Sequence, residues 1–150
     1  MNLPELKIGK LVAQVPIIQG GMAIRLSTAP LAAAVANEGG IGLIAASGMG
    51  LDELRKEIRM ARELTGGKGI IGINAMVAAR QFLDLITTAA EEGIDLIVAG
   101  AGFSRDIFAV GKKYGVEVVP IVSSARLAQT AEKLGASAVV VEGTEAGGHL

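Results

Sequence analysis

His149, the one histidine of the chain, is the side chain best suited to proton transfer. An imidazole can transfer a proton or neutralise an anion near neutral pH. The segment Glu145–His149 (EAGGH) places two consecutive glycines before it, and these let the backbone pass close to a flat ligand. A lone histidine can equally be structural, so both interpretations stay open at this point. A metal site is disfavoured, because the chain has no cysteine to complete a ligand set.

Asn74 and the stretch Gly20, Gly21 and Met22 have groups suited to binding a ring system. The amide of Asn74 can donate and accept hydrogen bonds at once, which suits a heterocycle edge with adjacent carbonyl and N–H groups. An asparagine can also close a turn through its own backbone. The N–H groups of the glycine stretch could support a ring that no side chain obstructs, or the glycines could simply form a turn.

Two glutamates stand shortly before the histidine. Glu142 and Glu145 would be costly to bury in a dry site without partners. We therefore expect either that one of them contacts a ligand hydroxyl group or that both face water.

Six short apolar runs must position these residues. Each run is rich in β-branched residues and nearly continuous in hydrophobicity, which is typical of strands covered on both faces of a parallel sheet. The runs are Val15–Gln19, Ile41–Ala45, Ile70–Ile73, Ile94–Val98, Glu117–Ile121 and Ala138–Val141. The sequence therefore predicts six strands of a parallel sheet.

Segments with helical spacing separate these runs. In one of them, Leu51, Leu54 and Ile58 share a face, and the charges of Asp52–Arg59 lie on the other. Four glycines stand just after predicted helices, where a left-handed C-cap favours a residue without a Cβ. The other expected helices are Thr28–Glu38, Arg80–Glu92, Ser104–Tyr114 and Ser124–Leu134, and the glycines are Gly39, Gly93, Gly115 and Gly135.

Strict alternation of strands and helices fits an open doubly wound sheet or three quarters of an eight-stranded barrel. The first run is followed by Gly20–Arg25 (GGMAIR), so the GxGxxG fingerprint of dinucleotide-binding sheets is missing. Small or polar residues follow nearly every run instead, as in a barrel whose loops converge on one face. We expect one α/β domain over residues 1–150 that supplies about six βα units of a (β/α)8 TIM barrel.

Composition and charge narrow the function classes. Fourteen basic and fifteen acidic residues give a formal net charge of −1, which offers no electrostatic reason to bind nucleic acid or an anionic membrane. The absence of cysteine excludes disulfides and a thiolate nucleophile. The start of the chain lacks the pattern of a signal peptide. We expect a cytoplasmic protein that acts on a small molecule, without nucleic-acid or membrane partners.

Several segments together resemble the nitronate monooxygenase family, formerly called the 2-nitropropane dioxygenase family. The flavin-dependent enoyl-ACP reductase is similar and shares the same motifs, so both belong to one FMN-binding TIM-barrel superfamily. The resemblance runs through the whole chain. Its most specific motif is EAGGH at Glu145–His149, followed by PIIQGGM at Pro16–Met22; the others lie at Gly39–Gly42, Gly72–Asn74, Gly100–Gly102, Val119–Ser123 and Glu142–Gly143.

The resemblance implies an FMN at the C-terminal mouth of the barrel, with His149 at the position of the family's active-site histidine. Residue 124 is a serine here, where some nitronate enzymes have a lysine that contacts the flavin. The cofactor-binding residues that the resemblance implies are Gly20, Gly21, Met22, Asn74, Ser124, Glu142, Ala146 and Gly147.

The activity implied first is the FMN-dependent oxidation of alkyl nitronates by O2 to carbonyl compounds and nitrite. Reduction of an enoyl thioester with NAD(P)H, as in the enoyl-ACP reductase, is the first alternative. Family members are considerably longer, so we expect the sequence to be part of a longer enzyme. The second alternative is a non-catalytic half-barrel that forms a homo-oligomer through its open sheet edges. A lyase acting on a sugar phosphate is disfavoured, because no lysine follows a predicted strand.

Overall fold

The larger of the two sheets in the described residues consists of five parallel strands that lie side by side in chain order. The structure is a computed structural model that describes residues 3–147. The order β3-β4-β5-β6-β7 is that of a TIM barrel, since a doubly wound sheet would reverse direction at a switch point. The predicted barrel topology is confirmed, and the chain forms a half-barrel. The strands are β3 (Ile41–Ala45), β4 (Ile70–Met76), β5 (Leu96–Gly100), β6 (Glu117–Val122) and β7 (Val140–Val141).

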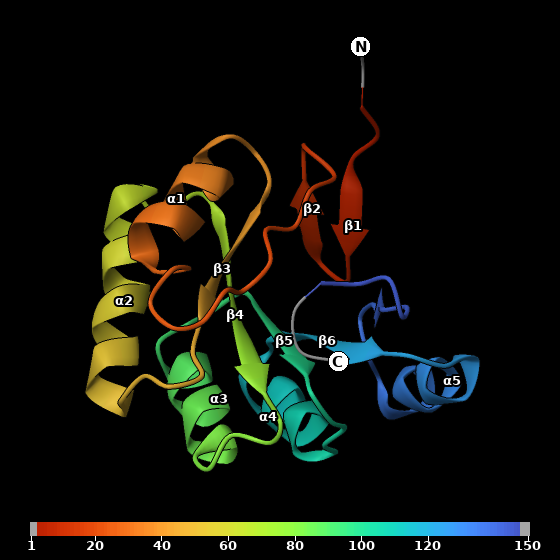
Figure 1. Cartoon of the computed structure of the whole chain (residues 1–150). Coiled ribbons are helices and arrows are strands. Elements are labelled where there is room, and N and C mark those ends of the chain that lie inside the picture. The colour runs from red at the N-terminus through yellow and green to blue at the C-terminus, as the bar shows by residue number, and fades with distance from the viewer. Residues whose placement is uncertain (1–2, 148–150) are drawn as a thin grey trace.

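A helix precedes each of these strands. Four helices fall within the predicted ranges, and α2 covers the predicted amphipathic stretch that begins at Leu51. Figure 1 shows α1 to α4 packed in sequence along one face of the sheet. The four predicted glycines all have positive φ, and Gly115 and Gly135 are themselves left-handed C-caps. No helix within residues 3–147 is long and apolar enough to cross a membrane. The helices are α1 (Ala29–Asn37), α2 (Leu51–Leu64), α3 (Phe82–Glu91), α4 (Asp106–Tyr114) and α5 (Ala125–Leu134).

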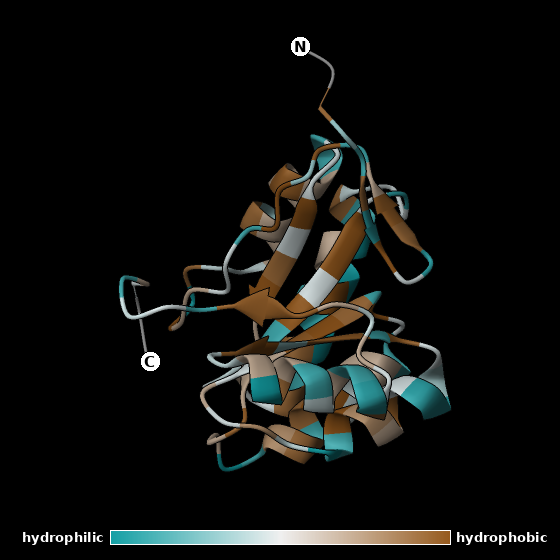
Figure 2. Ribbon diagram, turned by 90° about the vertical axis from the view of Figure 1, so that its right-hand side faces the viewer, coloured by the Kyte–Doolittle hydropathy of each residue, from teal (hydrophilic) through white to brown (hydrophobic). Residues whose placement is uncertain are grey.

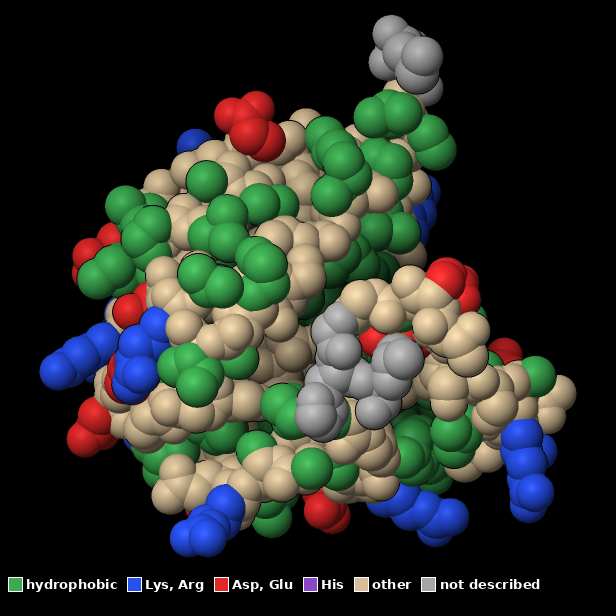
Figure 3. Space-filling model, in the orientation of Figure 1, with side chains coloured by type: hydrophobic (Ala, Val, Ile, Leu, Met, Phe, Trp, Pro, Cys, Tyr) green, Lys and Arg blue, Asp and Glu red, His purple; other side chains and the backbone are tan. Residues whose placement is uncertain are grey.

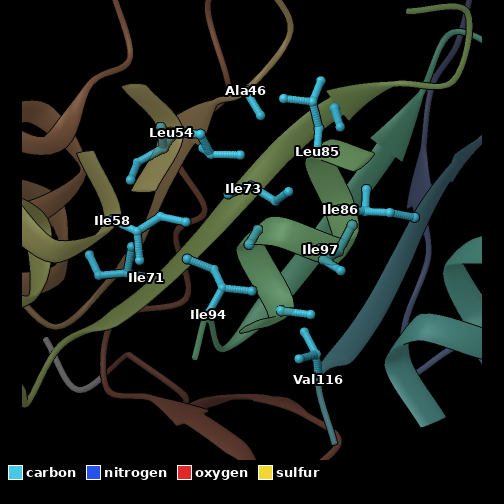
Figure 4. Packing of buried hydrophobic residues seen from close by; sticks show 14 of the residues in the cluster. Ala46, Leu54, Ile58, Ile71, Ile73, Leu85, Ile86, Ile94, Ile97 and Val116 are labelled. Atoms are coloured by element: carbon cyan, nitrogen blue, oxygen red, sulfur yellow. The ribbon is translucent and has the colours of Figure 1, made fainter. Parts of the chain in front are cut away.

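The larger apolar cluster fills the space between the sheet and the helices. Ile71, Ile73 and Ile97 point from β4 and β5 toward Leu54 of α2 and Ile86 of α3 (Figure 4), and all five side chains are fully buried. Each such side chain contributes about 1.5–3 kcal/mol through burial. In Figure 2 the strands are almost uniformly hydrophobic, whereas the helices alternate between hydrophobic and hydrophilic residues. This difference is the signal on which the sequence prediction of the two element types rested.

A second apolar cluster lies on the opposite face of the sheet and is covered by a hairpin that the sequence did not predict. The hairpin pairs β1 (Leu6–Ile8) with β2 (Leu11–Ala13) in antiparallel fashion. Its Ile8 packs with Leu43 and Leu96 of the sheet. At its turn, the backbone N–H of Lys10 donates to the carboxylate of Glu117, the first residue of β6, at 3.0 Å. The hairpin therefore covers the amino ends of the strands.

The predicted strand over Val15–Gln19 is wrong as a regular strand. Only an isolated parallel bridge joins Ile18 to Ile41 of β3, supported by a hydrogen bond of 3.0 Å from Gln19 N–H to the Ile41 carbonyl. Pro16 has no N–H to donate, which limits regular pairing here. The segment nevertheless lies beside β3, where the first strand of the barrel is expected. β4 extends three residues beyond the predicted run, so Asn74 lies inside a strand.

Candidate functional site

A cavity of about 650 Å³ lies at the carboxyl ends of the strands, opposite the hairpin. This is the end at which TIM barrels carry their ligands, and the volume is that of a typical small-molecule site. Six of the eight residues predicted to bind a cofactor line it. The lining residues are Gly20, Gly21, Met22, Ala23, Leu26, Ala45, Ser47, Asn74, Met76, Gly100, Ala101, Ile121, Glu142 and Gly147.

The glycines after the first apolar run form one wall of the cavity. A Cβ on Gly20 would meet no atom within 4 Å, so this backbone is unobstructed. Gly21 is different, because its backbone lies directly against the side chain of Asn74. Two peptide units without side chains thus face the cavity beside an amide group. A flat ring can approach such a wall closely, because no Cβ projects from it.

Asn74 lines the cavity from β4. It lies in β4 between Ala45 of β3 and Val98 of β5 in the sheet register, and its side chain is half-buried. Its neighbours Ile73 and Ala75 belong to the cluster under the helices, so Asn74 projects to the opposite face. No hydrogen bond of its side-chain amide is found within residues 3–147, and no buried side-chain nitrogen or oxygen in this range lacks a partner, so the amide atoms are open to the cavity and available to a ligand.

Three polar side chains outside the set of predicted cofactor-binding residues support the rim of the cavity. Ser47 Oγ accepts a hydrogen bond of 2.8 Å from the N–H of Met76. Gln19 Oε1 accepts one of 3.1 Å from Leu43 N–H. Ser27 is completely buried and bonds to the backbone on both sides of Gly21. Hydroxyl and amide groups of this kind are common in loops. Gln19 belongs to the PIIQGGM motif, whereas Ser27 is distinguished only by its complete burial.

An ion pair connects the loop that contains Gly20, Gly21 and Arg25 to α2. The guanidinium group of Arg25 donates two hydrogen bonds to the carboxylate of Glu53, at 2.8 and 3.1 Å. These bonds hold the pKa of Glu53 below its ordinary value and raise the pKa of Arg25. Both groups are open to solvent, so the pair contributes little to stability. Its effect is to limit where the loop can lie.

A second cavity of about 430 Å³ adjoins the first. Ala101, Ile121 and Glu142 line both, so the half-buried carboxylate of Glu142 stands at their junction. Phe103 and Leu127 contribute apolar side chains to the second cavity. In the view of Figure 3, apolar side chains form several patches among tan atoms, and most charged side chains lie toward the margin. Neither the site nor this surface carries a concentrated charge.

Two of the predicted residues, Ser124 and Ala146, do not line the first cavity, and a third falls outside the described part of the chain. Ser124 caps α5, where its Oγ accepts a hydrogen bond of 3.3 Å from Leu127 N–H, and it does not line the first cavity. Ala146 is half-buried next to the lining residue Gly147. His149 lies outside the described residues. The roles of all three stay predictions.

The described residues fit a planar heterocycle of the size of a flavin ring. Gly20 and Gly21 provide an unobstructed backbone, and Asn74 provides an amide with free donor and acceptor groups. Met22 and Leu26 add apolar side chains at the rim. Apolar walls with a few convergent polar groups are typical of cofactor sites.

Comparison with known proteins gives a family match over nearly the whole chain. The family model described as nitronate monooxygenase matches residues 5–94 and 77–150. Among curated proteins, the nitronate monooxygenase of Paraburkholderia phytofirmans is 32% identical, over 98% of this chain and 49% of that protein. A (3aS,4S,5R,7aS)-5-hydroxy-7a-methyl-1-oxo-octahydro-1H-indene-4-carboxyl-CoA dehydrogenase of Mycobacterium tuberculosis is 31% identical, over 89% of this chain and 37% of that protein.

A solved structure shows the same likeness. FabK from Thermotoga maritima superimposes with a TM-score of 0.84 at 38% identity, over 90% of this chain and 42% of that chain. The chain thus spans less than half the length of each of these three relatives.

Proposed function

The chain belongs to the nitronate monooxygenase family, and we propose that its cavity binds the isoalloxazine ring of FMN in a flavin-dependent oxidoreductase. The proposal rests on one observation: the Gly20–Met22 backbone and the Asn74 amide line the same cavity and contact each other. We further propose that residues 1–150 belong to a single FMN-binding βα-barrel domain. The reaction proposed first is the oxidation of an alkyl nitronate by O2 to a carbonyl compound and nitrite.

Asn74 and the glycine stretch orient the ring in this proposal. The amide of Asn74 pairs with the carbonyl and N–H groups at the ring's edge, and Gly21 allows the ring and the amide to share the same wall. Met22 and Leu26 cover apolar parts of the ring and exclude water. A buried polar group left without its partner costs about 1–3 kcal/mol, so this pairing fixes orientation as well as affinity.

The chemistry needs an electron acceptor and a group that handles charge on the substrate. FMN, when bound, supplies reversible two-electron transfer. His149 neutralises the anionic nitronate or moves a proton, as an imidazole can near neutral pH. Glu142, Ala146 and Gly147 contact the cofactor from the segment after β7, and Ser124 does so from the start of α5.

Reduction of an enoyl thioester with NAD(P)H is the second candidate. The likeness to FabK, an enoyl-ACP reductase, favours it. The mycobacterial relative is named as the dehydrogenase of a carboxyl-CoA compound, which is also a thioester. Both reactions use the same proposed cofactor, so they differ in the substrate and in the partner that exchanges electrons with it.

Flavin fluorescence tests the cofactor proposal on this chain. Titration of riboflavin with the protein should quench the flavin emission in a saturable way. Asn37→Ala serves as a control for amide removal, because Asn37 lies in α1 and lines a different cavity at the amino ends of the strands. The proposal fails if the wild-type chain shows no saturable quenching. Assays of nitrite release from a nitronate with O2, and of NAD(P)H oxidation with an enoyl thioester, then separate the two reactions.

A further inference from the structure

Ser27 connects three residues of the loop at the cavity mouth, Gln19, Gly20 and Met22, through one buried hydroxyl group. Its side chain is completely inaccessible to solvent. Oγ accepts hydrogen bonds from the N–H of Met22 at 2.9 Å and from Nε2 of Gln19 at 2.8 Å. It donates one of 3.1 Å to the carbonyl of Gly20. The hydroxyl therefore uses its one donor and both of its acceptor positions.

The backbone of Ser27 connects the same loop to the sheet. Its N–H donates to the Met22 carbonyl at 3.0 Å, and its carbonyl accepts from Ala45 N–H at 2.9 Å. Ala45 is the last residue of β3 and the register partner of Asn74. One residue thus links the glycine loop to the strand beside Asn74.

Gly21 is enclosed by these bonds. Its two neighbours, Gly20 and Met22, are both bonded to Ser27 Oγ, and its own backbone lies against Asn74. Without the hydroxyl, the Met22 N–H would lose this partner, and the Gly20 carbonyl would keep only its hydrogen bond from Gln19 Nε2. The Met22 peptide unit could then turn toward water. The glycine wall would then no longer hold its distance from the amide.

We propose that Ser27 is a positioning residue whose hydroxyl holds the Gly20–Met22 backbone against Asn74 and so shapes the wall that receives the ligand ring. The statement about the ring rests on the flavin site proposed above, whereas the statement about the loop does not. Ser27 does not line the cavity, so its effect on a ligand is indirect.

The test compares Ser27→Ala with Thr65→Val in the full chain. Thr65 is also buried, and its Oγ1 donates to the Ala61 carbonyl at 3.0 Å, but it lies at the amino ends of the strands. Thr65→Val thus reports the general cost of removing a buried hydroxyl group. Hydrogen exchange of the Met22 amide, riboflavin affinity and melting temperature are measured for both variants.

We expect Met22 amide exchange to accelerate and riboflavin affinity to fall in Ser27→Ala, each by about 5- to 150-fold, as expected for one lost buried partner. Thr65→Val should lower the melting temperature with both properties unchanged. Met22 exchange and riboflavin affinity at wild-type values in Ser27→Ala would overturn the proposal, whatever its melting temperature.

A second variant and a second readout distinguish failure of this proposal from failure to fold and from failure of the flavin site. If Ser27→Ala does not fold, Gln19→Met removes one partner of the same hydroxyl, and Met22 exchange and riboflavin affinity are read in that variant. If the wild-type chain does not bind riboflavin, the flavin site is overturned. Met22 exchange then decides the role of Ser27 in the loop alone.

Discussion

The backbone of Gly21 and the side chain of Asn74 occupy touching positions across the cavity wall. A Cβ on residue 21 would overlap the Cβ of Asn74 and lie 2.8 Å from its Cγ. The loop and the strand can therefore keep this spacing only with glycine at position 21. The conformational range of glycine is not the reason here, since the requirement comes from the neighbouring side chain.

Gly21→Ala should destabilise the protein, whereas Gly20→Ala should not. The added methyl group at position 21 overpacks against Asn74, at a cost of about 1–3 kcal/mol. This corresponds to a fall of about 2–12 °C in melting temperature for a chain of this size. At position 20 the methyl group meets no atom within 4 Å. Thermal unfolding followed by circular dichroism checks both, and equal melting temperatures would contradict the packing argument.

Asn74→Ala should weaken flavin binding while the fold persists. The half-buried amide has no partner within the described chain, so its loss removes no internal hydrogen bond, but the ring's edge loses its partner. We expect riboflavin affinity to fall by about 5- to 150-fold. Fluorescence titration measures it, with Asn37→Ala as the control. A lower melting temperature with wild-type affinity would instead assign Asn74 a structural role.

Riboflavin and FMN should bind to this chain with similar affinities. Among the described residues that line the cavity, the one charged side chain is the carboxylate of Glu142, so the lining offers no cation for the phosphate group. We expect the two dissociation constants to agree within about threefold, since a charge-assisted bond of 1.5–3 kcal/mol would change them far more. Parallel titrations decide, and much tighter binding of FMN would indicate a phosphate site.

His149→Ala should lower turnover by about 10²–10⁴ in whichever assay the wild type is active, the usual effect of losing a general acid or base. The residue follows two glycines in a loop after the last predicted strand, so unfolding should be little affected. Steady-state rates, flavin content and melting temperature are compared with those of the wild type. Unchanged turnover, or loss of flavin together with the fold, would make the histidine structural.

Glu92→Gln should reduce the dependence of stability on acid pH. Hydrogen bonds from the Arg59 guanidinium, at 2.7 and 2.8 Å, lower the pKa of Glu92 from its ordinary value of 4.5. A carboxylate with a lowered folded-state pKa stabilises the fold above the unfolded-state pKa, and this contribution is lost as the pH falls through the folded-state value.

Urea unfolding at pH 7 and at pH 3 measures the effect. The wild type should lose more stability between these two pH values than Glu92→Gln does. Glu132→Gln changes an exposed glutamate of α5 and is the control. An identical loss in the wild type and in Glu92→Gln would mean that the pair with Arg59 does not contribute.

The repeated part of the fold could be predicted from the sequence because its signal repeats. Runs such as Ile41–Ala45 are buried on both faces and therefore contain few polar residues, and Gly115 and Gly135 mark the ends of helices that require a left-handed residue. Asn74 and Gly21 could be proposed together because they follow different runs of the same parallel pattern. The convergence of strand ends then places them in one cavity.

The remaining features depend on contacts that no local pattern contains. The three-residue strands of the hairpin are too short for a periodic signal, and their pairing is stabilised by contact with the sheet. Ser27 differs from other serines only by its burial. Val15–Gln19 has the composition of a strand, but Pro16 and the single neighbouring strand restrict it to one bridge.

The hairpin also constrains the order in which parts of the chain can fold during synthesis. The hydrogen bond between Lys10 and Glu117 spans 107 positions, so the ribosome releases the hairpin long before it makes β6. Until β6 is made, Ile8 and the apolar residues that it packs against lack part of their native contacts and are open to non-native association. Closure of the amino end is therefore a late, long-range event, and a nascent chain arrested before residue 117 presents an apolar surface that chaperones can bind.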